Sequence, residues 1–449
     1  MMDALYIAGP VGVIAIALGA RRARQMPTWV AAWVSLIALA TAAAQVPALA
    51  HGRWPAIVGV VTDLIAATSA WDSVRWLAQH PRMPSLRYYV WWALFWGALV
   101  AIATANNLGV AWVAIEFSTL SSAALIAELG HRRALEAAWK YVLIASIGLA
   151  LGLVGIIFVY GSLAPLGLGW QALSFPVLAH HAHQIPRIIR ELAMILVVSG
   201  FGTKAGLVPF HTWLPDAHSE APSPVSGLLS GVLLGLCLLT IERFRAAVPL
   251  PATVLWTGGH LLAVFGGLSV LVGSLALLGQ RDIKRLLAYS SIEQMGLVAI
   301  GLSIGTPLAI TAALLQFVFH AVIKSGLFFE AGHLAAVYRT QRLTRITGIW
   351  RRDRRAGVRW SVGILALAGM PPLGLAFSEW MLLDALWRAH QVVLVLVISG
   401  ALLITFAALV HHWLDGLWGG MPAGTAHASV AAAALMGEGN GRTGGDRDV

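Results

Sequence analysis

Two lysines lie within long apolar segments, in a chain that otherwise relies on arginine as its basic residue. The sequence has 26 arginines but only four lysines, and Lys204 and Lys324 are the two inside apolar runs. A buried ammonium group can give up its proton, whereas a guanidinium group keeps a fixed charge. Ionised side chains at membrane depth are costly and are typical of ion pathways. We interpret both lysines as candidate proton carriers; for Lys204 the alternative is a structural ion pair or a side chain that reaches the membrane surface.

Three more ionisable residues lie where they can act together with these lysines. Glu116 is nine residues into its apolar segment, and pairing a carboxylate with an ammonium lowers the cost of both buried charges and couples their titrations. His320 and Lys324 are four residues apart, which places them on one face of a helix. Glu379 follows two consecutive prolines, and broken helices occur in membranes where a cavity or a protein partner satisfies the backbone. We therefore expect Glu379 at a hydrated opening.

The stretch between Pro209 and Pro224 supplies a second group of polar residues. We expect it to be a cytoplasmic connection that acts as a proton-uptake surface or as a contact to a partner subunit. Its candidate residues are His211, Asp216, His218 and Glu220. The two histidines are seven residues apart with no third ligand at a recognisable spacing, so we expect no metal site.

Five other acids lie within apolar segments or close to their ends. For each of them three alternatives stay open: an interfacial position, a pair with an arginine, or a structural hydrogen-bond acceptor. These acids are Asp63, Glu128, Glu293, Glu330 and Asp384.

The elements that must hold all these residues are membrane-spanning helices. The chain has 449 residues, of which 58% are hydrophobic and 11% charged, against roughly 25% charged in soluble proteins. Runs long enough to cross a bilayer, about 17 to 25 residues, recur along it, and we expect an all-α polytopic protein of about thirteen spans. They lie near residues 4 to 20, 28 to 50, 55 to 78, 88 to 105, 108 to 128, 138 to 160, 191 to 209, 225 to 242, 253 to 278, 286 to 303, 308 to 337, 358 to 386 and 391 to 413. Glycines and prolines interrupt the twelfth, which we expect to form two half-helices.

Several classes of chemistry find no support in the sequence. A single cysteine, Cys237, excludes internal disulfides and iron–sulfur ligation by this chain. Neither a GxGxxG nor a GxxxxGK[ST] loop occurs, so no dinucleotide or ATP site is indicated. We therefore expect no cofactor and no catalytic site of its own. The formal net charge is +10, but its distribution over the loops points to the membrane and not to nucleic acid.

Basic residues are unevenly divided between alternate loops. If the N-terminus lies outside, the inner loops carry 20 lysines and arginines and the outer loops six. The positive-inside rule then predicts a multi-pass protein of the cell membrane, with its N-terminus outside and its C-terminus in the cytoplasm.

Six stretches of the sequence match one family. They are TKAGLVPFHTWLPDAHSEAPSPVSGLLSG, NNLGVAWVAIE, LEAAWKY, DIKRLLAYSSIEQMG, FHAVIKSGLFF and AGMPPLGLAFSEW. Together they resemble the antiporter-like proton-channel subunits of respiratory complex I, of Mrp antiporters and of membrane-bound hydrogenases, most of all the hydrogenase-4 component F type. The resemblance implies two inverted five-helix repeats, each with one interrupted helix. It also implies three regions: N-terminal helices over 1–105, the translocation core over 106–420 and a tail over 421–449, whose composition indicates disorder.

The resemblance implies roles for the candidate residues. Glu116 and Lys204 take the places of the family's glutamate and lysine pair, Lys324 that of the lysine beside a histidine, here His320, and Glu379 that of the terminal ionisable residue. The family moves protons, driven by electron transfer in other membrane and soluble subunits. The implied function is therefore a proton-translocating subunit of a complex I-like or hydrogenase-type complex. The alternatives are an Mrp-like cation/proton antiporter module and a membrane subunit or scaffold of an inorganic-carbon uptake complex.

Four positions depart from the family pattern. Gly235 stands where many members carry a lysine or another polar residue. Two alternatives follow: water fills the gap, or conduction is reduced. Gln316 and Gln294 stand where histidines are frequent, and Glu330 adds an acid where a small or apolar residue is usual.

Overall fold

The computed structural model describes residues 1–449 except 1, 21–22, 24, 51–53, 251–256 and 420–449. The tail expected over 421–449 lies outside the described residues. In chain order, the helices up to residue 220 are α1 (Met2–Gly19), α2 (Met26–Ala50), α3 (Trp54–Gln79), α4 (Ser85–Thr104), α5 (Leu108–Ala127), α6 (Arg132–Leu163), α7 (Phe175–His181), α8 (Arg187–Lys204) and α9 (Trp213–Glu220). The later helices are α10 (Ser223–Leu228), α11 (Leu234–Ala247), α12 (Gly258–Leu278), α13 (Ile283–Ile304), α14 (Pro307–Tyr338), α15 (Ile349–Arg352), α16 (Arg354–Leu367), α17 (Gly374–Arg388) and α18 (Val392–Trp418).

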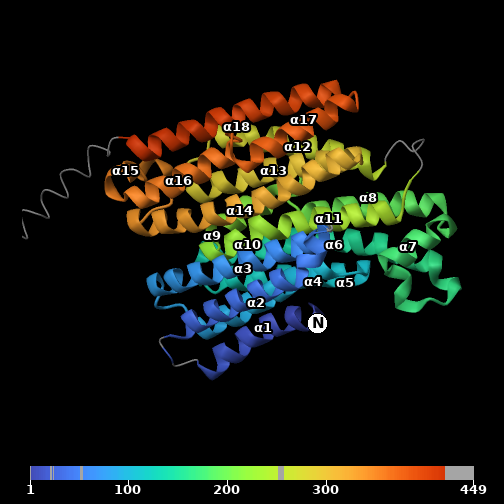
Figure 1. The fold of residues 1–449 in the computed structure, drawn as a ribbon, viewed down its shortest axis with the longest axis horizontal. Helices are drawn as coiled ribbons and strands as arrows, with labels where there is room; N and C mark the ends of the chain where they lie inside the picture. The colour runs from blue at the N-terminus through green and yellow to red at the C-terminus, as the bar shows by residue number, and fades with distance from the viewer. Residues whose placement is uncertain (1, 21–22, 24, 51–53, 251–256, 420–449) are drawn as a thin grey trace, which may run out of the picture.

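Short turns complete the helical structure. The 3₁₀ turns are η1 (Ala164–Leu166), η2 (Gly169–Leu173), η3 (Ala182–Gln184), η4 (Phe210–Thr212) and η6 (Leu343–Arg345), and a π-helical turn, η5 (Leu229–Leu233), joins α10 to α11. The long helices lie side by side along the longest axis of the molecule, with α1 at one edge and α18 at the opposite edge (Figure 1).

Ten helical segments of the described residues are long and apolar enough to cross a membrane. They are Met26–Ala48, Trp54–Gln79, Ser85–Thr104, Leu108–Ala127, Arg132–Leu166, Ser223–Ala247, Gly258–Leu278, Ile283–Ile304, Pro307–Tyr338 and Val392–Trp418. The other three expected spans are helical too, as α1, as α8 and as α16 with α17. The all-helical membrane architecture predicted from the sequence is confirmed, and so are the two half-helices of the twelfth segment.

Two of the segments expected to span the membrane, near residues 191 to 209 and 358 to 386, contain a helix that ends at a glycine, and the two endings have the same form. α8 is followed by Gly206 with φ of 76°, and α16 by Gly369 with φ of 70°. In each case the next amide donates to a carbonyl five residues earlier: Leu207 N to Gly202 O at 2.9 Å, and Met370 N to Leu365 O at 3.1 Å. This glycine-terminated ending satisfies carbonyls that the helix leaves unpaired. The sequence analysis expected the span that begins near residue 191 to continue to residue 209. That bound is wrong: α8 ends at Lys204, because the backbone turns out of the helix at Gly206.

Several helices begin at a residue whose side chain accepts hydrogen bonds from the free amide groups of the first helical turn. The residues that cap long helices in this way are Asn107, His131, Thr257, Asp282, Thr306 and Asp353.

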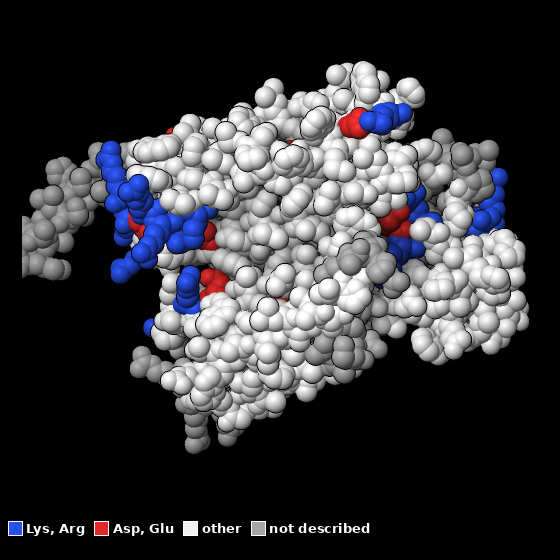
Figure 2. All heavy atoms as spheres, in the orientation of Figure 1, with Lys and Arg blue, Asp and Glu red and all other residues white. Residues whose placement is uncertain are grey.

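The charged residues on the visible face lie mainly toward the ends of the helices (Figure 2). Lysines and arginines gather at the end where α15 and α16 lie, and the middle of the visible face is formed mostly by uncharged residues (Figure 2).

An ion pair ties α14 to α16 near this basic end. Glu330 is 6% exposed. It accepts from Arg359 Nε at 2.5 Å and from Arg359 Nη2 at 3.2 Å. The acid that departs from the family pattern thus has an arginine as its partner, which is one of the three alternatives left open by the sequence.

Arg359→Ala is expected to lower the free energy of unfolding by about 1–3 kcal/mol, because the buried carboxylate of Glu330 loses its donor. Unfolding in detergent micelles, followed by circular dichroism, measures the change. The double variant E330A/R359A should regain stability, since no unpaired charge stays buried. Arg388→Ala, which breaks an exposed pair with Asp384, is the control and should be near neutral. An R359A protein as stable as the wild type would contradict the structural role of the pair.

Candidate functional site

Lys204 is enclosed at the end of α8 by side chains from three other helices. It is fully buried. Its ammonium nitrogen donates to Thr119 Oγ1 of α5 at 2.7 Å and to the Tyr141 hydroxyl of α6. It also lies 4.3 Å from the Tyr141 ring centroid and 5.7 Å from that of Trp213 in α9. Each of these partners is uncharged, so hydroxyl groups and aromatic rings hold the ammonium group.

Glu116 lies on α5 one turn before Thr119 and bonds to α6. Ser146 donates to its Oε1 at 2.7 Å, while its Oε2 is buried and lacks a hydrogen-bond partner among the described residues. Glu116 and Lys204 interact electrostatically, yet in the described part of the chain they form no direct ion pair. In this conformation Thr119, and not Glu116, is the α5 residue that contacts the ammonium group.

Lys324 and His320 share one face of α14, as their spacing predicts, and both are fully buried. The Lys324 ammonium donates to the Leu287 carbonyl and to Ser290 Oγ, both on α13. His320 Nε2 lies 3.3 Å from the carbonyl oxygen of Ser230, in the π-helical turn η5. His320 Nδ1 has no partner among the described residues. The imidazole therefore keeps one nitrogen that can accept or donate a proton.

The two histidines of the stretch after Lys204 lie at different depths. His211 is half-buried in the turn η4. His218 is fully buried in α9 and stacks on Phe328 of α14, with ring centroids 4.8 Å apart. The expected surface position of His218 is therefore wrong, because α9 turns this side chain toward α14.

Asp216 and Glu220 are the two acids of α9, and both are partly exposed. Asp216 Oδ1 accepts from Arg285 Nη2 at 2.5 Å, and Glu220 Oε2 lies 3.8 Å from His131 Nε2. These partners come from the starts of α13 and α6. The pairs therefore hold the end of α9 between two other helices.

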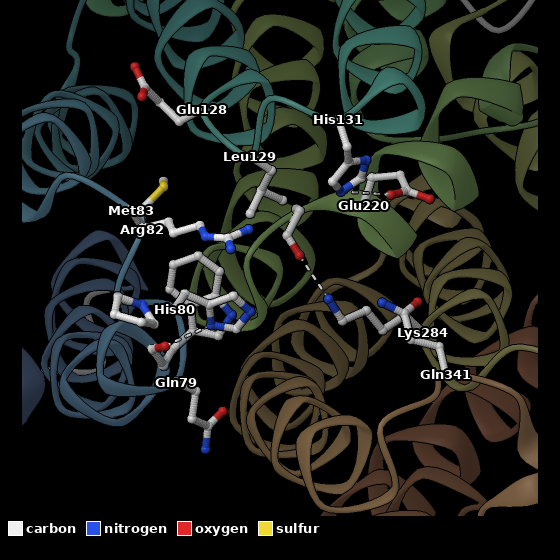
Figure 3. Close-up of a pocket in the computed structure, with 13 residues that line it drawn as sticks. Gln79, His80, Arg82, Met83, Glu128, Leu129, His131, Glu220, Lys284 and Gln341 are labelled. Carbon is white, nitrogen blue, oxygen red and sulfur yellow. Dashed lines mark hydrogen bonds and ion pairs between the residues drawn. The ribbon is translucent and has the colours of Figure 1, made fainter.

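A pocket of about 640 Å³ opens beside Glu220. Figure 3 shows Glu220 and His131 on one side of it and Lys284 on another. Lys284 is 5% exposed, and its ammonium donates to the Ala221 carbonyl at 2.8 Å. A buried ammonium group thus borders a polar opening, in a position that the sequence analysis did not single out.

The place of the missing lysine at Gly235 is filled by an aromatic ring. A Cβ added to Gly235 would lie 2.0 Å from Phe317 Cδ2. Phe317 is fully buried, and so is Gly235. The suggestion that water fills this gap is wrong for this conformation, because the phenyl ring packs directly against the glycine.

A chain of buried polar side chains connects α13, α14 and α17. Ser378 donates to Gln316 Oε1 at 2.5 Å, and Gln316 Nε2 donates to Gln294 Oε1 at 2.5 Å. Gln294 Nε2 then reaches two carboxylates, Glu293 Oε2 at 3.0 Å and Glu379 Oε1 at 3.5 Å. The two glutamines are the residues that depart from the family's histidines. Through Gln294 Nε2 they link Glu379 to a second acid, Glu293.

Each of the five acids left undecided by the sequence has a partner of one of the expected kinds. The contacts are Asp63 with Trp96, Glu128 with Arg87, Glu330 with Arg359 and Asp384 with Arg388. The fifth acid, Glu293, is fully buried and accepts a hydrogen bond from Gln294 Nε2. The sequence analysis named Glu293 but missed its link to Glu379; the adjacent Gln294, recognised there as a departure, is the signal that could have found it.

Comparison with known proteins gives one consistent result. The model of the family described as NADH:quinone oxidoreductase/Mrp antiporter, TM, matches residues 105–405. The hydrogenase-4 component F homolog of Methylacidiphilum infernorum is 37% identical over 359 residues, which are 78% of this chain and 75% of that protein. NADH-quinone oxidoreductase subunit N of Desulforudis audaxviator is 31% identical over 74% of this chain and 65% of that protein. The match thus leaves out about a third of the second relative's length.

A solved structure shares the fold. A chain of the Mrp complex from Dietzia sp. DQ12-45-1b superposes with a TM-score of 0.80, at 20% identity, over 94% of this chain and 81% of that one. At this identity the likeness concerns the arrangement of the helices, and it covers the N-terminal helices as well as the region that the family model matches.

Proposed function

Since the chain belongs to the NADH:quinone oxidoreductase/Mrp antiporter transmembrane family, we propose that it is a proton-translocating membrane subunit of a complex I-like or hydrogenase-type complex. Redox chemistry in partner subunits drives the protons. The observation that carries the proposal is Lys204: a fully buried ammonium group at the break of a spanning helix, held by neutral hydroxyl and aromatic groups. Such a group binds a proton without a fixed counter-charge that would retain it.

In this proposal the proton moves along the bundle between ionisable side chains. Lys204 holds it while Glu116 is near, and a change in that interaction pushes the proton toward His320 and Lys324, and then to Glu379. The buried positions of Lys204, His320, Lys324 and Glu379 and the unpaired nitrogen of His320 support this route. Asp216 and Glu220 form the uptake or partner surface, beside the pocket that Lys284 borders.

The finer architecture is part of the same proposal. About thirteen spans cross the membrane, and the translocation core is residues 106–420. The last ten spans, which begin with α4, form two inverted repeats of five. The matching glycine-terminated endings of α8 and α16 support such a repeat, because each lies in the fourth span of its set. The arginine-rich end around α15 faces the cytoplasm, with the N-terminus outside.

The test is proton translocation by the native complex, purified through a tag on this chain and reconstituted in liposomes. With dihydrogen and NADH offered in turn as electron donors, a pH-sensitive dye should report proton movement that is the same in sodium-free and sodium-containing buffer. Movement that requires sodium would replace the proposal by a cation/proton antiporter module. Electron transfer with no proton movement would replace it by a scaffold, including the inorganic-carbon uptake alternative.

A further inference from the structure

Glu293 and Glu379 are two acids from different helices that accept from the same amide group. Both side chains are buried, Glu293 fully and Glu379 to 8% exposure. One amide nitrogen, Gln294 Nε2, lies within hydrogen-bonding distance of both. In the described residues neither acid has a lysine, arginine or histidine within ion-pair distance, whereas each of the acids Glu128, Glu330 and Asp384 does.

Two buried carboxylates that share one amide donor cannot both carry a full negative charge without a large cost. Like charges that share a low-dielectric site separate their titrations, so that one group keeps a proton that the other has lost. Glu293 Oε1 is buried and lacks a hydrogen-bond partner among the described residues. An unpaired oxygen of this kind is where a proton can bind.

The surrounding polar groups favour a proton over a metal cation. Ser378, Gln316 and Gln294 form a chain in which every donor points toward the carboxylates. The amide oxygens of both glutamines are already used as acceptors within this chain. Alkali and alkaline-earth cations need several oxygen ligands at once, and these amides present N–H groups to the acids instead.

The groups that face the pair from neighbouring helices are mostly neutral. Gly273 of α12 packs against the backbone and Cβ of Glu293, and Gly369 at the end of α16 packs against Glu379 Oε2. From α14 come Gln316 and the basic residues His320 and Lys324. Lys324 interacts electrostatically with Glu293, but its hydrogen bonds go to Leu287 and Ser290.

From this geometry we propose that Glu293 and Glu379, bridged by Gln294, form a shared proton-binding site in which one carboxyl group carries a proton while the other is ionised. The site deepens the proposed function and rests on it for its role in transport: it stores a proton that arrives from Lys324 until the proton leaves through the break between α16 and α17. The transfer moves a proton from a carboxylic acid to a carboxylate, and no electron or other group moves.

The experiment is an infrared titration of the full chain in lipid nanodiscs, which follows the C=O band of protonated carboxyl groups and its shift in D₂O. The wild type should lose this buried signal in two separate steps as the pH rises. Glu293→Gln and Glu379→Gln should each leave one step, and the wild-type curve should differ from the sum of the two single-variant curves. The double variant should show neither step.

Glu191→Gln is the matched control, since Glu191 is paired with Arg187 at the start of α8, and it should keep both steps. Glutamine has the shape of glutamate, and thermal unfolding of each variant verifies its fold. Single-variant curves that add up to the wild-type curve would overturn the shared site. So would a curve that changes when sodium chloride replaces choline chloride, because the site would then bind a cation.

This titration and the transport assay fail independently of each other. If the chain titrates in two coupled steps but its complex moves no protons, the shared site is retained and the proposed function is rejected. If the complex moves protons but the two acids titrate independently, the proposed function is retained and the shared site is rejected.

Discussion

Lys204→Ala is expected to reduce proton translocation by the assembled complex to the background of empty liposomes. The side chain is the only basic group that contacts Thr119 and Tyr141 in the described structure, so its loss leaves these hydroxyls without a proton carrier. Assembly should persist, because the hydrogen bonds of Lys204 go to neutral hydroxyls, and Glu116 keeps its own hydrogen bond from Ser146. Dye quenching during electron transfer measures the first effect, and co-purification of the partner subunits measures the second.

Lys204→Arg separates a proton carrier from a structural charge. Arginine keeps a positive charge at this place but does not release its proton. The K204R variant should therefore also fail to translocate protons. Arg388→Ala removes an exposed positive charge and is the control that should retain translocation. Full translocation by K204A would remove Lys204 from the route, and full translocation by K204R would assign it a purely electrostatic role.

Gly235→Lys is expected to destabilise the protein by about 1–3 kcal/mol or more, as overpacking of a filled core does. The first atom of the new side chain would lie 2.0 Å from Phe317 Cδ2. Restoring the family's lysine at this position therefore requires room. Phe317→Ala provides it, and the double variant G235K/F317A should fold with nearly the stability of F317A alone.

Thermal unfolding of the four proteins in detergent tests this coupling as a double-mutant cycle. Gly161→Lys is the control, since nothing lies within 4 Å of a Cβ added at Gly161. If G235K were as stable as G161K, the phenyl ring would be easily displaced and would not seal the middle of the bundle. A double variant that also translocates protons faster than the wild type would identify Phe317 as the barrier.

The candidate site residues that could be predicted from the sequence are ionisable residues, which are rare in an apolar run. Lys204, Lys324 and Glu379 were found in this way, and His320 by its spacing from Lys324; all four are buried in the structure. Their roles in translocation are still predictions. What an apolar context indicates is burial, because an ionisable residue in such a run must be enclosed by the protein.

The missed features depend on partners far away in the sequence. Whether a buried acid is neutralised depends on a side chain from another helix, as for Glu330 and Arg359, so Glu293 did not stand out. The ring that fills the place of a lysine at Gly235 comes from Phe317, on α14. By contrast, the early end of α8 had a local signal, since Gly206 followed by a proline at 209 is a common helix stop.

The two glycine-terminated breaks have an electrostatic consequence at both ends of the proposed route. The C-terminal end of an α-helix carries a partial negative charge from its aligned peptide dipoles. Lys204 is the last residue of α8, and Glu379 Oε2 lies against Gly369, just after the end of α16. Each half-helix thus directs its negative pole at an ionisable group. The same backbone ending, used twice, favours positive charge at both places: an ammonium group at the first and, in the site we propose, a bound proton at the second.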